Sequence, residues 1–169
     1  NTSQTGYQEA LSDPSYTKQI ITFTFPHVGI VGTNQEDQES KKIYADGCVI
    51  NQPLSEYSNW RAENDLNSYF LTNKIPCIFG IDTRYLTKKL SLEGAVKAAV
   101  IHFGEGENKI EKLKTQLNEW KGLQNLDLAG IVSTEQNYNW KKGIWKSDTS
   151  SKSQFKYNVT CLDFGIKNN

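Results

Sequence analysis

Runs of apolar residues alternate with polar blocks in a pattern that predicts both strands and helices. The runs at 20–25, 43–50, 77–81 and 96–103 are short and rich in β-branched or aromatic residues, which is typical of strands. The run at 77–81 has no polar position, so we expect that strand to be covered on both faces. Asp46-Gly47 interrupts the second run and predicts a bulge there.

Apolar residues at helical spacing predict helices at 63–73 and 108–121. A further helix is expected after Asp82, whose side chain suits an N-cap, and before Gly94, which suits a helix end. Gly6 can open a short helix near the start of the chain. The order of strands and helices predicts an α/β fold, with strand–helix–strand connections around Ile78 and Val100.

Residues 147–154 are small and polar, which is typical of a linker, and an apolar run at 157–164 predicts a strand after it. We therefore expect one domain at 1–150 and the start of a second at 155–169. No window of 18 uninterrupted apolar residues is present, so no transmembrane helix is predicted.

Charge and cysteine content narrow the classes of partner and compartment. Lys+Arg and Asp+Glu both number 19, so the formal net charge is zero and gives no electrostatic reason to expect nucleic acid or a membrane as partner. The 3 cysteines are odd in number and far apart, which favours a reducing compartment over a disulfide framework.

The spacing of the cysteines and histidines predicts neither a cysteine nucleophile nor a metal site. A nucleophile elbow needs glycines two positions before and after the reactive residue, and Cys48, Cys77 and Cys161 all lack them. Each is expected to be a buried, inert thiol in an apolar strand. His27 and His102 have no Cys or His at metal-ligand spacing, so no metal site is predicted. His27, at a strand end before a glycine-rich loop, stays a weak candidate for a functional role.

Three polar segments are further candidates. Glu36 and Asp37 lie on a polar loop and are expected to be solvated. Residues 82–84, Asp-Thr-Arg, follow a strand, where open α/β sheets bind ligands; the alternative is that Asp82 only caps a helix and Arg84 pairs with a carboxylate. The turn at 13–16, Asp-Pro-Ser-Tyr, can present Ser15 to a polar ligand or simply face water. No glycine pattern predicts a phosphate site.

The segments at 1–16 (Asn-Thr-Ser-Gln-Thr-Gly-Tyr-Gln-Glu-Ala-Leu-Ser-Asp-Pro-Ser-Tyr) and 80–90 (Gly-Ile-Asp-Thr-Arg-Tyr-Leu-Thr-Lys-Lys-Leu) closely resemble the N-terminal domain of the carbamoyl-phosphate synthase small subunit. The resemblance to this domain continues at residues 19–29, 32–34, 138–140 and 143–145. The ending at 162–169 resembles the entry strand of that family's class I glutamine amidotransferase domain.

The resemblance implies a swivelling β/β/α-type domain, with its opening strands missing, followed by the first strand of a truncated amidotransferase domain. It implies a subunit that hydrolyses L-glutamine and passes ammonia to a large subunit. That subunit uses ATP, Mg²⁺ and bicarbonate to make carbamoyl phosphate for arginine and pyrimidine biosynthesis. This chain is then a scaffold and docking domain in a heterodimer, with no cofactor of its own.

Carried over by position, the family's glutamine-contacting serine is Ser15. The family's catalytic Cys, His and Glu are expected beyond Asn169, so no catalytic residue is expected in this chain. The expected location is the cytoplasm, with a plastid as the alternative. A free-standing interaction module without glutaminase activity, and a small-molecule-binding protein acting at 82–84, stay open as rival hypotheses.

Overall fold

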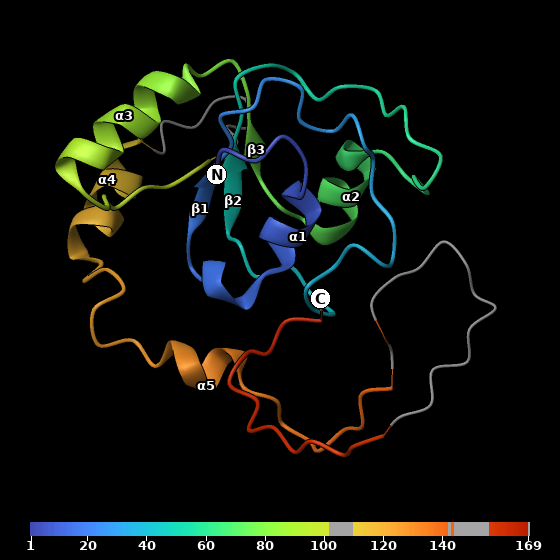
Figure 1. The fold of residues 1–169 in the computed structure, drawn as a ribbon. Coiled ribbons are helices and arrows are strands. Elements are labelled where there is room, and N and C mark those ends of the chain that lie inside the picture. The colour runs from blue at the N-terminus through green and yellow to red at the C-terminus, as the bar shows by residue number, and fades with distance from the viewer. Residues whose placement is uncertain (102–109, 142, 144–155, 169) are drawn as a thin grey trace.

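The computed structural model describes residues 1–101, 110–141, 143 and 156–168. Within them, β1 (Ile20–Thr22), β2 (Gly47–Val49) and β3 (Cys77–Ile78) form a parallel sheet in the order β1-β2-β3 (Figure 1). The helices are α1 (Tyr7–Ser12), the 3₁₀ helix η1 (Pro14–Tyr16), α2 (Leu66–Asn73), α3 (Thr83–Glu93), α4 (Ile110–Glu119) and α5 (Leu128–Val132). The predicted α/β class is therefore confirmed.

The middle strand fixes the register of the sheet. Cys48 of β2 lies opposite Ile21 of β1 on one side and Cys77 of β3 on the other. Helix α2 lies between β2 and β3 in the chain, so these two strands and the helix form the strand–helix–strand connection expected near Ile78. The second connection, around Val100, is not formed: residues 96–101 are not in a strand, and 102–103 lie outside the described residues.

The second strand is shorter than predicted because part of its backbone bonds elsewhere. The amides of Tyr44 and Ala45 both donate to the carbonyl of Leu11, at 3.0 and 3.1 Å. This interaction satisfies the end of α1 and takes residues 43–46 out of the sheet. The bulge predicted at Asp46-Gly47 is therefore wrong, since pairing begins only at Gly47.

Two apolar runs were also interpreted wrongly. The run at 77–81 is not covered on both faces, because β3 is a two-residue edge strand and Phe79 is 58% exposed. The run at 157–164 forms no strand, and Tyr157 and Leu162 are 85% and 83% exposed. A strand needs a neighbouring strand for its backbone groups, and none of the described strands pairs with this segment.

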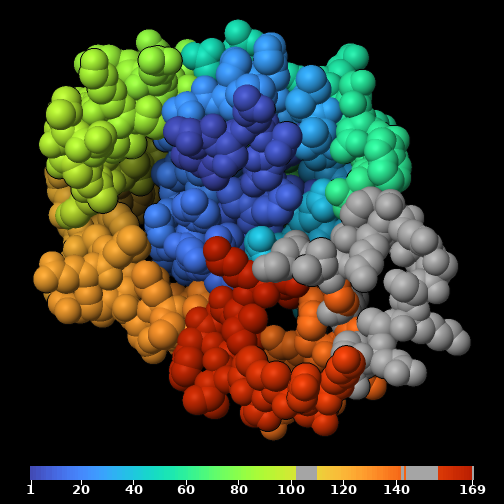
Figure 2. Space-filling model, in the orientation of Figure 1, coloured from blue at the N-terminus to red at the C-terminus, as the bar shows by residue number. Residues whose placement is uncertain are grey.

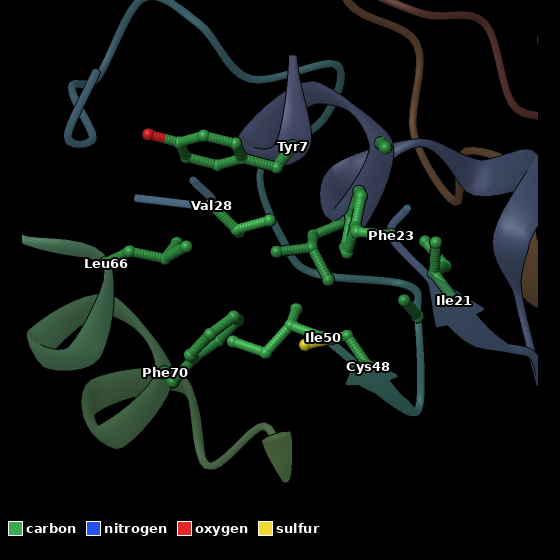
Figure 3. Packing of buried hydrophobic residues seen from close by; sticks show 11 residues of the cluster. Tyr7, Ile21, Phe23, Val28, Cys48, Ile50, Leu66 and Phe70 are labelled. Atoms are coloured by element: carbon green, nitrogen blue, oxygen red, sulfur yellow. The ribbon is translucent and has the colours of Figure 1, made fainter. Parts of the chain in front are cut away.

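The core lies where helices α1 and α2 meet the sheet. Tyr7 of α1, Ile21 of β1, Cys48 of β2, and Leu66 and Phe70 of α2 converge in one apolar cluster (Figure 3). All five are buried, and Cys48 is 0% exposed. The apolar stripe of α2 thus holds this helix against the sheet, as its helical spacing predicts.

The helix ends predicted at Gly6, Asp82 and Gly94 are confirmed, and Asp65 provides a further cap. The Asp82 carboxylate accepts the Tyr85 amide at 2.8 Å, and Asp65 accepts the Ser68 amide at 2.8 Å, so both residues are N-caps. Gly94 ends α3 with φ 83°, and Gly6 precedes α1 with φ 80°. The predicted helix at 108–121 is observed at 110–119; its first two residues lie outside the described part of the chain.

The C-terminal segment returns to the start of the chain. In Figures 1 and 2 the described C-terminal residues lie against the N-terminal part of the molecule, next to the segment that follows α5. The amide of Asn168 donates to the carbonyl of Glu39 at 2.9 Å. The proposed linker at 147–154 lies outside the described residues, so the domain boundary stays a prediction. No helix in the described part is long and apolar enough to cross a membrane.

Candidate functional site

The turn that carries Ser15 is fixed by hydrogen bonds between its own residues, from side chains as well as backbone. Asp13 ends α1 and caps η1, and its Oδ1 accepts the amide of Ser15 at 2.8 Å. The amide of Tyr16 donates to the carbonyl of Asp13 at 3.0 Å, and Thr17 Oγ1 donates to the carbonyl of Pro14 at 2.6 Å. Ser15 itself is exposed. The fold therefore holds the backbone of Ser15 rigidly and presents the residue to solvent.

An ion pair ties this turn to the C-terminal segment. Asp13 Oδ2 accepts from Lys167 Nζ at 2.6 Å, and the side chains are 10% and 46% exposed. Burial raises the pKa of Asp13, but hydrogen bonds from Lys167 and Ser15 outweigh it, so the pKa lies below its usual value. The same hydrogen bond, which Lys167 donates to Asp13, raises the pKa of Lys167. Both groups are therefore charged at neutral pH.

The C-terminal segment has its own anchor at Asp163. Its Oδ1 accepts the amides of Gly165 and Ile166, both at 2.8 Å, and its Oδ2 accepts the hydroxyl of Tyr138 at 2.6 Å. The bond from Tyr138, followed by the backbone bonds, lowers the pKa of Asp163. The turn that carries Lys167 is thus hydrogen-bonded both to the segment after α5 and to Asp13.

Gly165 brings the segments together at close range. Its φ is +102°, and an added Cβ would lie 2.9 Å from Val132 Cγ2 and 3.2 Å from Pro14 Cβ. Only glycine fits this position without strain, on both counts. Pro14 of the η1 turn, Val132 of α5 and the C-terminal turn therefore meet at one point.

A cleft of about 710 Å³ opens at this meeting point. It is lined by Pro14, by residues from the 40–44 loop, by residues of 132–141 and by residues of 163–168. Its size is that of a small-molecule site, and its lining combines polar groups with Trp140 and Tyr138. Ser15 is not part of the lining, but it is the next residue after Pro14.

The Asp82-Thr83-Arg84 segment supports the capping alternative over a ligand site. Asp82 caps α3 as described, and the exposed Arg84 makes no ion pair among those found for the described residues, so the pairing expected for it is not observed. The hydroxyl of Thr83 is buried and has no partner in the described part of the protein. None of these three residues lines the cleft of about 710 Å³.

The histidines and cysteines that the sequence offered as candidates differ in their exposure. His27 is exposed and packs edge-on against Phe25, and His102 lies outside the described residues. Among the cysteines, Cys48 is buried as predicted, but Cys77 is half-buried and Cys161 is exposed outside any strand, so the prediction of three buried strand thiols is wrong.

Glu36 is exposed as predicted, whereas Asp37 is half-buried, and an arginine binds both carboxylates. Arg61 contacts Glu36 at 3.1 Å and Asp37 at 2.8 Å, and Asn34 Nδ2 donates to Asp37 at 2.8 Å. These bonds fix the polar loop after Gly32 against the segment before α2. In the described ranges no group of three or more His, Cys, Asp or Glu side chains is placed to hold a metal ion.

Reasoning from local pattern missed the residues that complete the site. Lys167, Asp163 and Gly165 were identified only as part of a resembling motif. No spacing connects them with Asp13, because they lie about 150 positions away in the chain. The opposite charges of Asp13 and Lys167 are the signal that could have linked the two turns. This signal becomes useful only once the turns are known to meet.

The described residues thus form an α/β fold in which an ion pair joins the turn at 13–16 to the C-terminal turn, beside the cleft of about 710 Å³. A sequence model of the carbamoyl-phosphate synthase small chain, CPSase domain, matches residues 1–100. The chain therefore belongs to the carbamoyl-phosphate synthase small chain family.

Curated relatives agree along the whole chain. The carbamoyl phosphate synthase small chain of Zymomonas mobilis is 40% identical over 172 residues, which cover 100% of this chain and 46% of the relative. Those of Vibrio cholerae and Bartonella quintana are 43% and 41% identical, again over 100% of this chain, and 45% and 44% of the relatives. The chain thus spans less than half the length of these relatives.

Proposed function

We propose that this chain is part of the glutamine-hydrolysing small subunit of carbamoyl phosphate synthase. In this proposal the subunit supplies ammonia to a large subunit, which makes carbamoyl phosphate from bicarbonate and ATP for arginine and pyrimidine biosynthesis. The chain serves as scaffold and docking domain and contributes one contact to L-glutamine, through Ser15. ATP and Mg²⁺ are bound by the large subunit, in the cytoplasm or alternatively in a plastid.

The observation that carries the proposal is the Ser15 turn beside its cleft. Ser15 is exposed, its amide is held by Asp13, and Asp13 is held in turn by Lys167. The segment that carries Lys167 resembles the entry of an amidotransferase domain. The ion pair therefore supports the proposal that Ser15 lies near the junction between the N-terminal domain and the glutamine-binding domain.

The chemistry of a hydroxyl suits one end of the glutamine molecule. Ser15 Oγ can accept a hydrogen bond from the α-ammonium group or donate one to the α-carboxylate. The negative charge of Asp13 is already paired with Lys167, so Ser15 offers a neutral hydrogen-bonding group. We expect this contact to bind and orient glutamine without taking part in amide hydrolysis.

Replacing Ser15 with alanine in the assembled enzyme tests this role. A hydrogen bond to a charged group contributes about 1.5–3 kcal/mol, so we expect Ser15→Ala to raise the KM for glutamine roughly 10- to 100-fold. Carbamoyl phosphate synthesis driven by ammonia should be unchanged. Ser91→Ala, which removes an exposed hydroxyl from α3, is the matched control. Loss of both activities in Ser15→Ala would instead indicate a defect in folding or assembly.

A free-standing interaction module is the second candidate function. The 169 residues contain no glycine-flanked cysteine elbow, so both candidates predict that this chain alone hydrolyses no glutamine. Measurable glutaminase activity from the purified chain would refute both. Reading the gene downstream separates them: a Gly-x-Cys-x-Gly elbow with a later His-x-Glu supports the enzyme subunit, and a stop codon supports the module.

A further inference from the structure

Two cysteines that are far apart in sequence are neighbours in the sheet. Cys48 of β2 and Cys77 of β3 are direct partners in the parallel ladder, and the Cys48 amide donates to the carbonyl of Pro76 at 3.0 Å. Partners on adjacent parallel strands lie about 4.8 Å apart and point to the same face of the sheet. Here that face is the core, because Cys48 belongs to the apolar cluster and Cys77 packs against it.

The spacing of the pair is compatible with a covalent bond. Disulfide-bonded cysteines have Cα atoms about 4.4–6.8 Å apart, and neighbouring strands fall inside this range. Any backbone shift that closing the disulfide requires falls on β3, which has only two residues and forms the edge of the sheet. Both thiols are free in this structure.

The two thiols differ in a way that assigns them different roles. Cys48 is 0% exposed, whereas Cys77 is half-buried. A hydrogen bond with Cys48 lowers the pKa of Cys77, and the same bond, followed by burial, raises the pKa of Cys48. The more accessible thiol is thus also the one that ionises first, and thiolates are the reactive form of cysteine.

We propose that Cys48 and Cys77 form a redox-active dithiol that a peroxide oxidant converts into a cross-strand disulfide. The Cys77 thiolate attacks one oxygen of hydrogen peroxide, the O–O bond breaks, and hydroxide leaves to become water. Cys77 is then a sulfenic acid. The sulfur of Cys48 attacks that of Cys77, the S–O bond breaks, and the thiol proton leaves with the hydroxyl as a second water. Two thiols are oxidised and one peroxide is reduced.

Peptide mapping of the assembled, intact protein tests the proposal. Trypsin places Cys48 on peptide 43–61 and Cys77 on peptide 75–84, so a disulfide between them joins two separate peptides. After a brief exposure to hydrogen peroxide and alkylation of the remaining thiols, we expect the joined peptide, and we expect dithiothreitol to release both halves. Cys161→Ser, which removes the exposed thiol, should leave this product unchanged, and Cys77→Ala should abolish it.

A second reagent tests, in the unmutated protein, whether the two thiols lie close enough to be bridged. Phenylarsine oxide bridges two neighbouring thiols with loss of water, so native mass spectrometry should detect one bound phenylarsenic group that excludes Cys48 and Cys77 from alkylation. The proposal is overturned if peroxide converts Cys77 to a sulfinic acid while Cys48 stays a thiol, or if only Cys161 reacts with either reagent. These outcomes do not depend on whether any variant folds.

Discussion

The ion pair between Asp13 and Lys167 makes a quantitative prediction about how the two ends of the chain are held together. Asp13 has two separate bonds: Oδ1 caps the turn through the Ser15 amide, and Oδ2 binds Lys167 at 2.6 Å. Asp13→Asn removes the charge but keeps an oxygen for the cap, whereas Asp13→Ala removes both bonds. The two variants therefore separate the cap from the ion pair.

The expected magnitudes follow from exposure. A cap contributes about 1 kcal/mol. The ion pair is short, but the Lys167 side chain is 46% exposed and solvent screens it, so we assign it about 1 kcal/mol. Asp13→Ala should then lower the free energy of unfolding by about 2 kcal/mol, and Asp13→Asn and Lys167→Met by about 1 kcal/mol each.

Urea denaturation of a double-mutant cycle measures the interaction directly. Because one bond is lost in both single variants, Asp13→Asn combined with Lys167→Met should cost about 1 kcal/mol rather than 2. Lys18→Met is the matched control: its pair with Asp46 is 3.8 Å long and half-exposed on both sides, and its loss should change stability by less than about 0.5 kcal/mol. Fully additive losses in the cycle would refute the pairing.

Three further predictions concern the site and the core. Gly165→Ala should destabilise the protein by about 1–3 kcal/mol because of its positive φ and its contact with α5, whereas Gly143→Ala, with no atom within 4 Å of the new Cβ, should be neutral in the same thermal unfolding assay. Leu66→Ala should cost about 2–5 kcal/mol by leaving a core cavity, against less than about 0.5 kcal/mol for Leu71→Ala, where Leu71 is 70% exposed. The lowered pKa of Asp13 stabilises the fold above its usual value of 3.8, and this stabilisation is lost as pH falls through the folded-state pKa. The stability difference between wild type and Asp13→Asn should therefore shrink as acid is added, and a difference that grows would contradict the assignment.

Local chemistry was the most predictable part of the fold. The N-cap at Asp82, the helix end at Gly94 and the amphipathic stripe of α2 depend on neighbours within a few positions, and all three were confirmed. Helix α5, whose cap Asp127 accepts the Gly130 amide at 2.8 Å, was missed because it is only five residues long.

Strand boundaries failed where partners were not local. The run that begins at residue 43 is apolar enough for a strand there, but the amides of Tyr44 and Ala45 bond to the end of α1 instead. Residues 157–164 are equally apolar and pair with no described strand. Hydrophobic pattern cannot distinguish these cases, because what decides a strand is the presence of a neighbour with free backbone groups.

In the candidate site, too, local features could be predicted and long-range contacts could not. The turn around Ser15 could be recognised from its own residues, and the structure places Ser15 on the surface as that interpretation requires. Lys167 and Asp163 could not be assigned to it by spacing, since the contact depends on how the chain returns to its start. The register that pairs Cys48 with Cys77 has the same origin.

The most direct test of the proposed function is reconstitution of the complete small subunit with a purified carbamoyl-phosphate synthase large subunit. Carbamoyl phosphate formation from ATP and bicarbonate is measured with glutamine and, separately, with ammonia as nitrogen donor. We predict that the large subunit alone uses only ammonia and that adding the small subunit makes glutamine an efficient donor. If glutamine supports no synthesis in the reconstituted complex while ammonia does, the proposed role as a glutamine-hydrolysing subunit is wrong.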